Sequence, residues 1–185
     1  MSSPVPTPLL LASLAALALV LGGAARSDLR TRRVGNRWLA MGAALALGLH
    51  AAATAAGLPA LAGARWWSPL AGALTGLALM LPMYLLRATG GADVKLVAVV
   101  GAFLGASAVT AAFIYTLLAG GLLSLFMLRD ASVLTRVMAN LRAHLAEHPR
   151  GTPPPTPLAH TAARLPYAVA IAMGTAAALV APPLV

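Results

Sequence analysis

Charged residues are confined to a few short parts of this chain, and long uncharged stretches separate them. The uncharged stretches are residues 1–25, 38–64, 66–86, 96–128 and 165–185. A helix that spans a bilayer needs about 20 apolar residues. The chain is 60% hydrophobic and only 9% charged, whereas about 25% of the residues in a soluble domain are charged. The pattern predicts a polytopic membrane protein and excludes a soluble nucleic-acid-binding protein, despite the net charge of +9.

The stretch of residues 96–128 is too long for one helix, whereas each of the other four fits a single span. Gly101, Gly105 and Ser107 offer places at which a helix can end. We therefore expect a short helix, a tight turn near Gly105 to Ser107, and a full helix over the remainder of the stretch. The expected fold is an all-α, polytopic integral membrane helix bundle with about six transmembrane segments.

The cations lie almost entirely on one side of this six-segment frame. Loops 26–37, 87–95 and 129–164 contain all of the thirteen Lys and Arg residues except Arg65. Loops rich in Lys and Arg stay in the cytoplasm, so we expect these loops inside and both chain ends outside. A cleaved signal peptide needs cations before its apolar stretch. Residues 1–8 have none, which predicts an uncleaved first helix.

The loop of residues 129–164 has two predicted parts. From Asp130 to His148, apolar residues recur at helical spacing, with arginines among the polar positions. This predicts an amphipathic helix on the inner membrane face, attracted to anionic lipid. Residues 151–157 (GTPPPTP) predict an extended proline-rich linker. We prefer a surface helix with a spacer to a partner-docking element, and we treat residues 1–185 as a single membrane-embedded domain.

Four carboxylate side chains occur in the chain, and their positions differ. Asp130 begins the amphipathic segment and Glu147 lies near its end, where both fit structural roles. Asp28 lies three residues after the first segment, and Asp93 lies three residues before the fourth, so both are expected at the cytoplasmic membrane boundary. Either packed helix ends bring them together as a pair, or Asp28 pairs with Arg32 and Asp93 caps the fourth helix.

The residues around Asp93 favour the paired arrangement. Gly90 and Gly91 precede the acid, and Lys95 follows it. Glycine permits positive φ and the close approach of another backbone, as a site for an extended peptide would require. Lys95 can lower the pKa of Asp93 or bind a phospholipid headgroup, and the sequence leaves both roles open.

Three segments resemble the motifs of type IV prepilin peptidases. GGADVKL at residues 90–96 resembles the second-aspartate motif, GxGDxK followed by an apolar residue. Asp28, followed by VGN at residues 34–36, resembles the first-aspartate motif, in which an apolar-Pro-Asn triplet follows the acid. Near the C-terminus, LPY at residues 165–167 with Gly174 is similar to the Pro-Tyr-Gly segment of the last helix. The motifs occur in the family's order.

The resemblance has departures, and none affects the two acids. Ala92 replaces the last glycine of GxGD, Gly35 replaces the proline before Asn36, and Ala168 stands at the glycine of the Pro-Tyr motif. The changes to alanine should be tolerated unless positive φ is required. The length and the lack of cysteine are similar to the short branch that accompanies Flp-type (tight-adherence) pili, since larger members carry a zinc-binding Cys cluster.

The resemblance implies a multi-pass aspartic endopeptidase of the bacterial cytoplasmic (inner) membrane that removes the basic leader peptide from prepilins at the cytoplasmic face. Asp28 and Asp93 are then the catalytic pair. The motif residues expected to shape the site are Asn36, Gly90, Gly91 and Lys95. Two close carboxylates share one proton, so one activates water while the other polarises the carbonyl, and no metal or cofactor is needed. The expected partners are prepilin precursors and the lipid bilayer, with no nucleic acid; the oligomeric state is left open.

Other polar residues carry less weight, and two other functions stay open. His50 lies inside the second segment, away from both acids, and is expected to be a neutral packed histidine. Trp66 and Trp67 beside Arg65 predict an anchor at the membrane interface. One alternative is a small transporter whose acids relay protons, although none of the four acids lies near the bilayer midplane. The other is an inactive relative that binds prepilins without cutting them.

Overall fold

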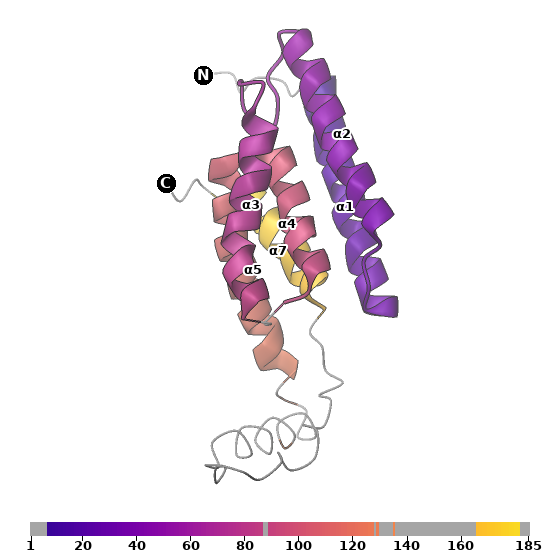
Figure 1. The fold of residues 1–185 in the computed structure, drawn as a ribbon, viewed down its shortest axis with the longest axis vertical. Coiled ribbons are helices and arrows are strands. Elements are labelled where there is room, and N and C mark those ends of the chain that lie inside the picture. The colour runs from indigo at the N-terminus through magenta and orange to yellow at the C-terminus, as the bar shows by residue number, and fades with distance from the viewer. Residues whose placement is uncertain (1–6, 87–88, 128, 130–134, 136–165, 182–185) are drawn as a thin grey trace. The chain divides into compact units, whose positions relative to one another are not determined.

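The computed structural model describes residues 7–86, 89–127, 129, 135 and 166–181, and it is helical wherever these residues form regular structure. The helices are α1 (Pro8–Thr31), α2 (Asn36–Ala55), α3 (Ser68–Leu85), α4 (Gly91–Leu104), α5 (Ala106–Met127) and α7 (Tyr167–Val180) (Figure 1). The predicted all-α bundle is confirmed.

The chain divides into two compact units. One unit contains Met1–Ala119 and Pro166–Val185, and the other contains Gly120–Leu165. Of the six helices named above, all belong to the first unit except for the last turns of α5. The predicted amphipathic helix and proline-rich linker lie outside the described residues. That residues 1–185 act as a single membrane-embedded domain stays a prediction.

Four helices are long and apolar enough to cross a membrane, namely α1, α2, α3 and residues Ala106–Phe126 of α5. α4 and α7 have 14 residues each, fewer than the ~20 that a full span needs. Large apolar side chains project outward from the long helices; Leu19 is 71% exposed and Leu122 is 69% exposed. Because exposed leucines in such numbers suit lipid better than water, they agree with the four spans. The chain is an integral membrane protein.

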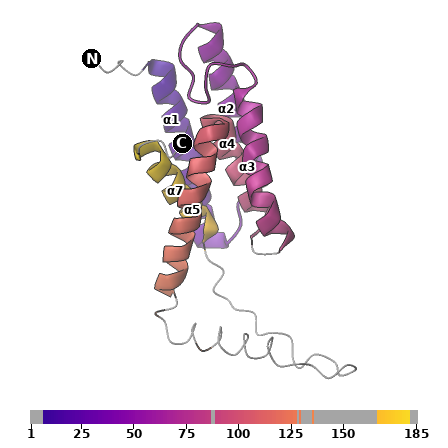
Figure 2. The ribbon, with the colours of Figure 1, turned by 90° about the vertical axis from the view of Figure 1, so that its left-hand side faces the viewer.

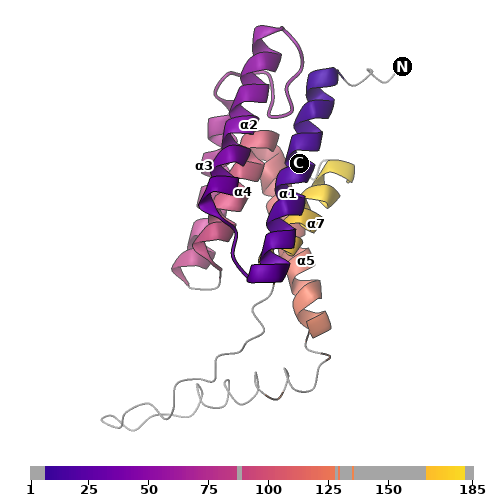
Figure 3. The ribbon, with the colours of Figure 1, turned by 90° about the vertical axis from the view of Figure 1, so that its right-hand side faces the viewer.

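The end of α1 is fixed by a tight turn and by α2. Arg32 has the left-handed cap conformation (φ 55°), and its N–H donates to the carbonyl oxygen of Asp28 at 2.9 Å. α2 then runs back along α1 (Figures 2 and 3). The indole N–H of Trp38 in α2 donates to the carbonyl oxygen of Val20 in α1 at 3.0 Å. This hairpin holds the helix end on which Asp28 lies.

The predicted break in the long apolar stretch is confirmed at Gly105. α4 ends at Leu104, Gly105 has φ 81°, and α5 begins at Ala106. A Cβ on Gly105 would collide with the carbonyl oxygen of Ala62, in the segment before α3. Glycine is therefore required here both for its positive φ and for the close backbone contact.

α4 is the most enclosed helix of the bundle. From Val94 to Leu104 its side chains are mostly buried, as expected for a helix that is apolar on all sides. Its backbone lies directly against that of α3 at Gly72 and Gly101, where a Cβ on either glycine would meet the other's carbonyl group. Small residues allow such close approach between membrane helices. α4 is consequently anchored to α3 along its length.

α7 lies against α1 and α5 (Figures 2 and 3). A Cβ on Gly174 of α7 would collide with the backbone and hydroxyl of Thr116 in α5. The Gly174 that resembles the family's last-helix motif thus serves close helix packing. The first turn of α7 lies next to the end of α1, where the Ala168 N–H donates to Asp28.

Candidate active site

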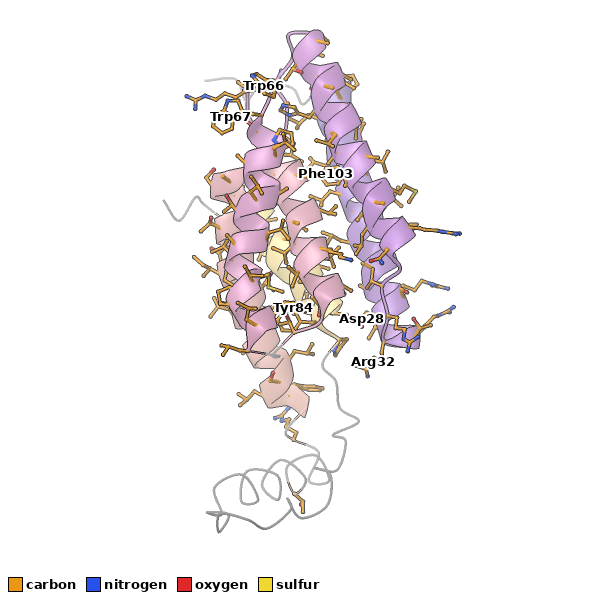
Figure 4. All side chains as sticks on the ribbon, viewed as in Figure 1. Asp28, Arg32, Trp66, Trp67, Tyr84 and Phe103 are labelled. Carbon is orange, nitrogen blue, oxygen red and sulfur yellow. The ribbon has the colours of Figure 1, made fainter. Side chains whose placement is uncertain are left out.

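Asp28 lies in the last turns of α1 and is 9% exposed. One of its carboxylate oxygens, Oδ2, accepts a 3.2 Å hydrogen bond from the backbone N–H of Ala168. Ala168 is in the first turn of α7, where amides have no partner within their own helix and carry partial positive charge. The carboxylate therefore caps a helix that lies 140 residues away in the sequence. Figure 4 shows Asp28 at the end of α1 that also carries Arg32.

Asp93 lies in the first turn of α4. Its Oδ2 accepts a 3.1 Å hydrogen bond from the backbone N–H of Gly90. Gly90 is the N-cap residue and Asp93 is the third residue of the helix, so Asp93 is not the N-cap predicted from the sequence but bonds the amide of the residue that is. The acid lies outside the four helices that are long enough to span the membrane. Burial raises the pKa of Asp93 to about 6, against a smaller lowering by the Gly90 N–H and with a further raise from the charge of Asp28.

The two acids interact with each other. The charge of Asp28 acts on Asp93 strongly enough to contribute to its raised pKa, and the helices that carry them, α1 and α4, are in contact. Asp93 therefore bonds the amide at the start of its own helix and is also acted on by the charge of Asp28. Two carboxylates on separate helices thus converge at one end of the bundle.

Two of the predicted site-shaping residues contact each other. The Lys95 ammonium donates a 3.0 Å hydrogen bond to Oδ1 of Asn36, the first residue of α2. Gly90 and Gly91 lie at the start of α4 as predicted, but one of the two reasons given for them, positive φ, is wrong. Gly90 has φ −85° and Gly91 is helical, so neither uses positive φ.

The departures from the family motifs are compatible with the backbone. Ala92 and Ala168 are in the first turns of α4 and α7, where alanine is a good helix former. Gly35 has φ −69°, close to the value that proline fixes. The backbone at this glycine therefore keeps the conformation that the family's proline would impose.

Sequence reasoning did not assign a role to Tyr167 or to the Ala168 amide. The Tyr167 hydroxyl donates to Sδ of Met83 in α3 at 3.8 Å, and the charge of Asp93 acts on the same hydroxyl. The Pro-Tyr pair at residues 166–167 was a signal for this segment, but nothing in it indicated which residues it would contact.

His50 and the tryptophans lie at the other end of the bundle from Asp28 (Figure 4). His50 is 6% exposed, and its Nε2 lies 3.0 Å from the carbonyl oxygen of Arg65, which agrees with a packed histidine. The Arg65 guanidinium stacks 5.3 Å from the ring centre of Trp67, while Trp66 is exposed. Among the described residues, no three His, Asp or Glu side chains are grouped as a metal site would require.

The model of the type IV leader peptidase family matches residues 10–125, more than half of the chain. The chain belongs to the type IV leader peptidase family. The match includes both acids and the four site-shaping residues, and it ends before α7 begins. The comparison with curated proteins finds no match, and neither does the comparison with solved structures. Membership of a leader peptidase family implies proteolytic activity in general.

Proposed function

We propose that this chain is a membrane aspartic endopeptidase that removes the basic leader peptide from type IV, Flp-like prepilins at the cytoplasmic face of the inner membrane. The observation that carries the proposal is the interacting pair of Asp28 and Asp93, one on α1 and one on α4, with the pKa of Asp93 raised to about 6. Membership of the leader peptidase family supports it.

In the proposed reaction the two acids hold different protonation states. Asp28 Oδ2 accepts the Ala168 N–H, and in this proposal Asp28 is the acid that takes the proton of the attacking water. Asp93 carries the shared proton and donates a hydrogen bond to the scissile carbonyl oxygen, because two adjacent carboxylates do not both ionise. Collapse of the tetrahedral intermediate breaks the C–N bond and passes the proton from Asp28 to the leaving amine.

The place of the acids also suits the proposed substrate. Both lie at helix ends rather than in the middle of a span. A prepilin presents its cleavage point between a basic leader and an apolar membrane helix. Its scissile bond can reach such a site while the apolar helix stays in lipid, so no water has to cross the bilayer.

Substitution of the acids tests the proposal. Asp→Asn keeps shape and hydrogen bonding but removes ionisation. Asp28→Asn and Asp93→Asn should each nearly abolish cleavage, and the double variant should be little worse than either, because groups that act as a unit are non-additive. The assay is co-expression with a candidate prepilin, in which leader removal is read as a mobility shift and normalised to enzyme in the membrane fraction.

Asp130→Asn and Glu147→Gln are the matched controls and should leave cleavage largely intact, since the sequence predicts structural roles for both acids and caps or surface charges contribute about 1 kcal/mol or less to stability. Equal loss in all four single variants would indicate a general folding effect. Full activity in Asp28→Asn or Asp93→Asn would exclude the two-aspartate mechanism. Co-precipitation of uncut prepilin with the wild-type chain would instead support an inactive, prepilin-binding relative.

A further inference from the structure

We infer that the first turn of α7 is a positioning element of the active site, in which the Ala168 amide orients Asp28 and the Tyr167 hydroxyl bonds Met83 of α3, the helix on which α4 is anchored. The inference rests on the proposed peptidase function. It concerns a segment outside the region that the family model matches, which ends at residue 125.

The first contact is the hydrogen bond from the Ala168 N–H to Asp28 Oδ2, 3.2 Å long and buried. A carboxylate on a helix surface can rotate about two side-chain bonds, and a buried donor selects one orientation. A backbone N–H can only donate, so the hydrogen bond favours Asp28 Oδ2 in the form without a proton. The second oxygen is then left for the water that the pair activates.

The second contact involves Tyr167, the residue before Ala168. Its hydroxyl donates to Met83 Sδ in α3 at 3.8 Å, and the charge of Asp93 acts on it. Tyr167 therefore connects α7 with α3, the helix on which α4 is anchored. The first turn of α7 thus contacts Asp28 directly and contacts α3, the helix that holds α4 and Asp93 in place.

The charged and titratable groups at this end of the bundle are few. α4 contributes Asp93 and Lys95, the latter hydrogen-bonded to Asn36 of α2, and α7 contributes Tyr167. Among the described residues, α1 and the turn after it add arginines at 26, 30, 32 and 33, α2 adds Arg37, and α3 adds Tyr84. Among the described residues of α7, the donor to Asp28 Oδ2 is the Ala168 N–H.

The test removes this one N–H. Replacing Ala168 by its α-hydroxy acid analogue, lactic acid, converts the amide into an ester of nearly the same shape. The same replacement at Ala172, in the interior of α7, is the matched control, because it removes a helix amide that is remote from the acids. Full-length protein is prepared in lipid vesicles, and cleavage is followed with a synthetic prepilin.

We expect the ester at 168 to lower kcat by about 10-fold to 100-fold, the cost of losing one hydrogen bond to a charged group, with KM changed by less than about 2-fold. The ascending limb of the kcat–pH profile should move about one pH unit upward. The ester at 172 should leave the profile in place. An unchanged kcat and profile in the 168 ester would overturn the inference.

A second readout does not need catalysis. A hydrophobic carbodiimide modifies protonated carboxyl groups, and peptide mass spectrometry reports the labelling of Asp28 at each pH. In the 168 ester, Asp28 should be labelled more extensively than in the wild type at the same pH, because the lost N–H no longer favours the charged carboxylate. A labelling shift in a chain whose wild type cleaves no prepilin would count against the proposed function and still support the contact.

Ala168→Pro removes the same N–H by other means, and proline is accepted in the first turn of a helix. Agreement between this variant and the ester supports positioning. If both fail to accumulate in the membrane while the 172 ester accumulates, the amide serves folding and the inference is wrong. Tyr167→Phe, which keeps the ring and removes the hydroxyl, should change kcat more than KM; an unchanged kcat would remove Tyr167 from the positioning element.

Discussion

The Lys95 ammonium of α4 donates a 3.0 Å hydrogen bond to the Asn36 side-chain oxygen at the start of α2. The sequence left two roles open for Lys95, lowering the pKa of Asp93 or binding a lipid headgroup. The bond to Asn36 adds a third, in which two motif residues far apart in sequence connect the turns that follow Asp28 and carry Asp93. Lys95 and Asn36 are both exposed, so the bond holds these turns together at the rim of the site.

Breaking this bond should have a small, non-additive effect on stability. Lys95→Met and Asn36→Ala should each lower the free energy of unfolding by about 0.5 kcal/mol, as for other exposed charged contacts, and the double variant should lose little more. Thermal unfolding in detergent, arranged as a double-mutant cycle, measures the coupling. Fully additive losses would show that the two side chains stabilise the protein independently.

The raised pKa of Asp93 predicts a pH-dependent stability. An acid whose pKa is raised from 3.8 to about 6 in the folded chain binds its proton more tightly there than in the unfolded chain. Its stabilising contribution is complete below about pH 4 and is lost as pH rises through about 6, up to about 3 kcal/mol. Unfolding of the wild type and of Asp93→Asn between pH 4 and 8 should diverge accordingly. Parallel curves would contradict the raised pKa.

Gly35→Pro should be tolerated and slightly stabilising. Gly35 has φ −69°, and a Cβ there meets nothing within 4 Å. Proline at a compatible position stabilises by about 0.4–1 kcal/mol, because it restricts the unfolded chain. Thermal unfolding of the two proteins is the measurement, and a lower midpoint for the proline variant would show that the residue before it resists the required extended conformation.

Adding one methyl group between α3 and α4 should be far more costly than adding it elsewhere. Gly101→Ala places a Cβ against the backbone of Gly72, while Gly22→Ala on α1 meets nothing within 4 Å. The first should cost about 1–3 kcal/mol through overpacking, and the second should be neutral or stabilising. Comparable unfolding midpoints for the two variants would mean that the helices separate without penalty.

The orientation predicted from the arginines can be tested with single cysteines, because the chain has none. Cysteines at Thr31 and Thr152 should resist a membrane-impermeant thiol reagent in intact cells, whereas a cysteine at Ala64 should react. The reason is the concentration of cations in the loops that contain the first two positions. Labelling of Thr31 from outside would place both acids on the wrong face for a cytoplasmic substrate leader.

The features of this fold that could be predicted from the sequence are those set by interactions between residues close together in the chain. The break at Gly105 follows from the length limit of a span and from glycine's freedom at positive φ, both of which are visible in one stretch of residues. Asp93 could be singled out for the same reason, since the glycines and the lysine that mark it are its neighbours in the sequence. The Ala168 contact with Asp28 leaves no trace in the sequence, because the donor is a backbone amide that every residue except proline has.

The length of α4 sets how far Asp93 lies from Gly105 along the helix axis. Gly105 seats the far end of the helix on the Ala62 carbonyl, and Asp93 lies twelve residues before it, or about 18 Å at 1.5 Å per residue. Since α4 is anchored along α3, this distance is set by the number of residues in the helix and not by the thickness of the lipid bilayer. A one-turn insertion in α4 would move the carboxylate by about 5.4 Å along the helix axis, and with it the point at which a membrane-held peptide meets the acids.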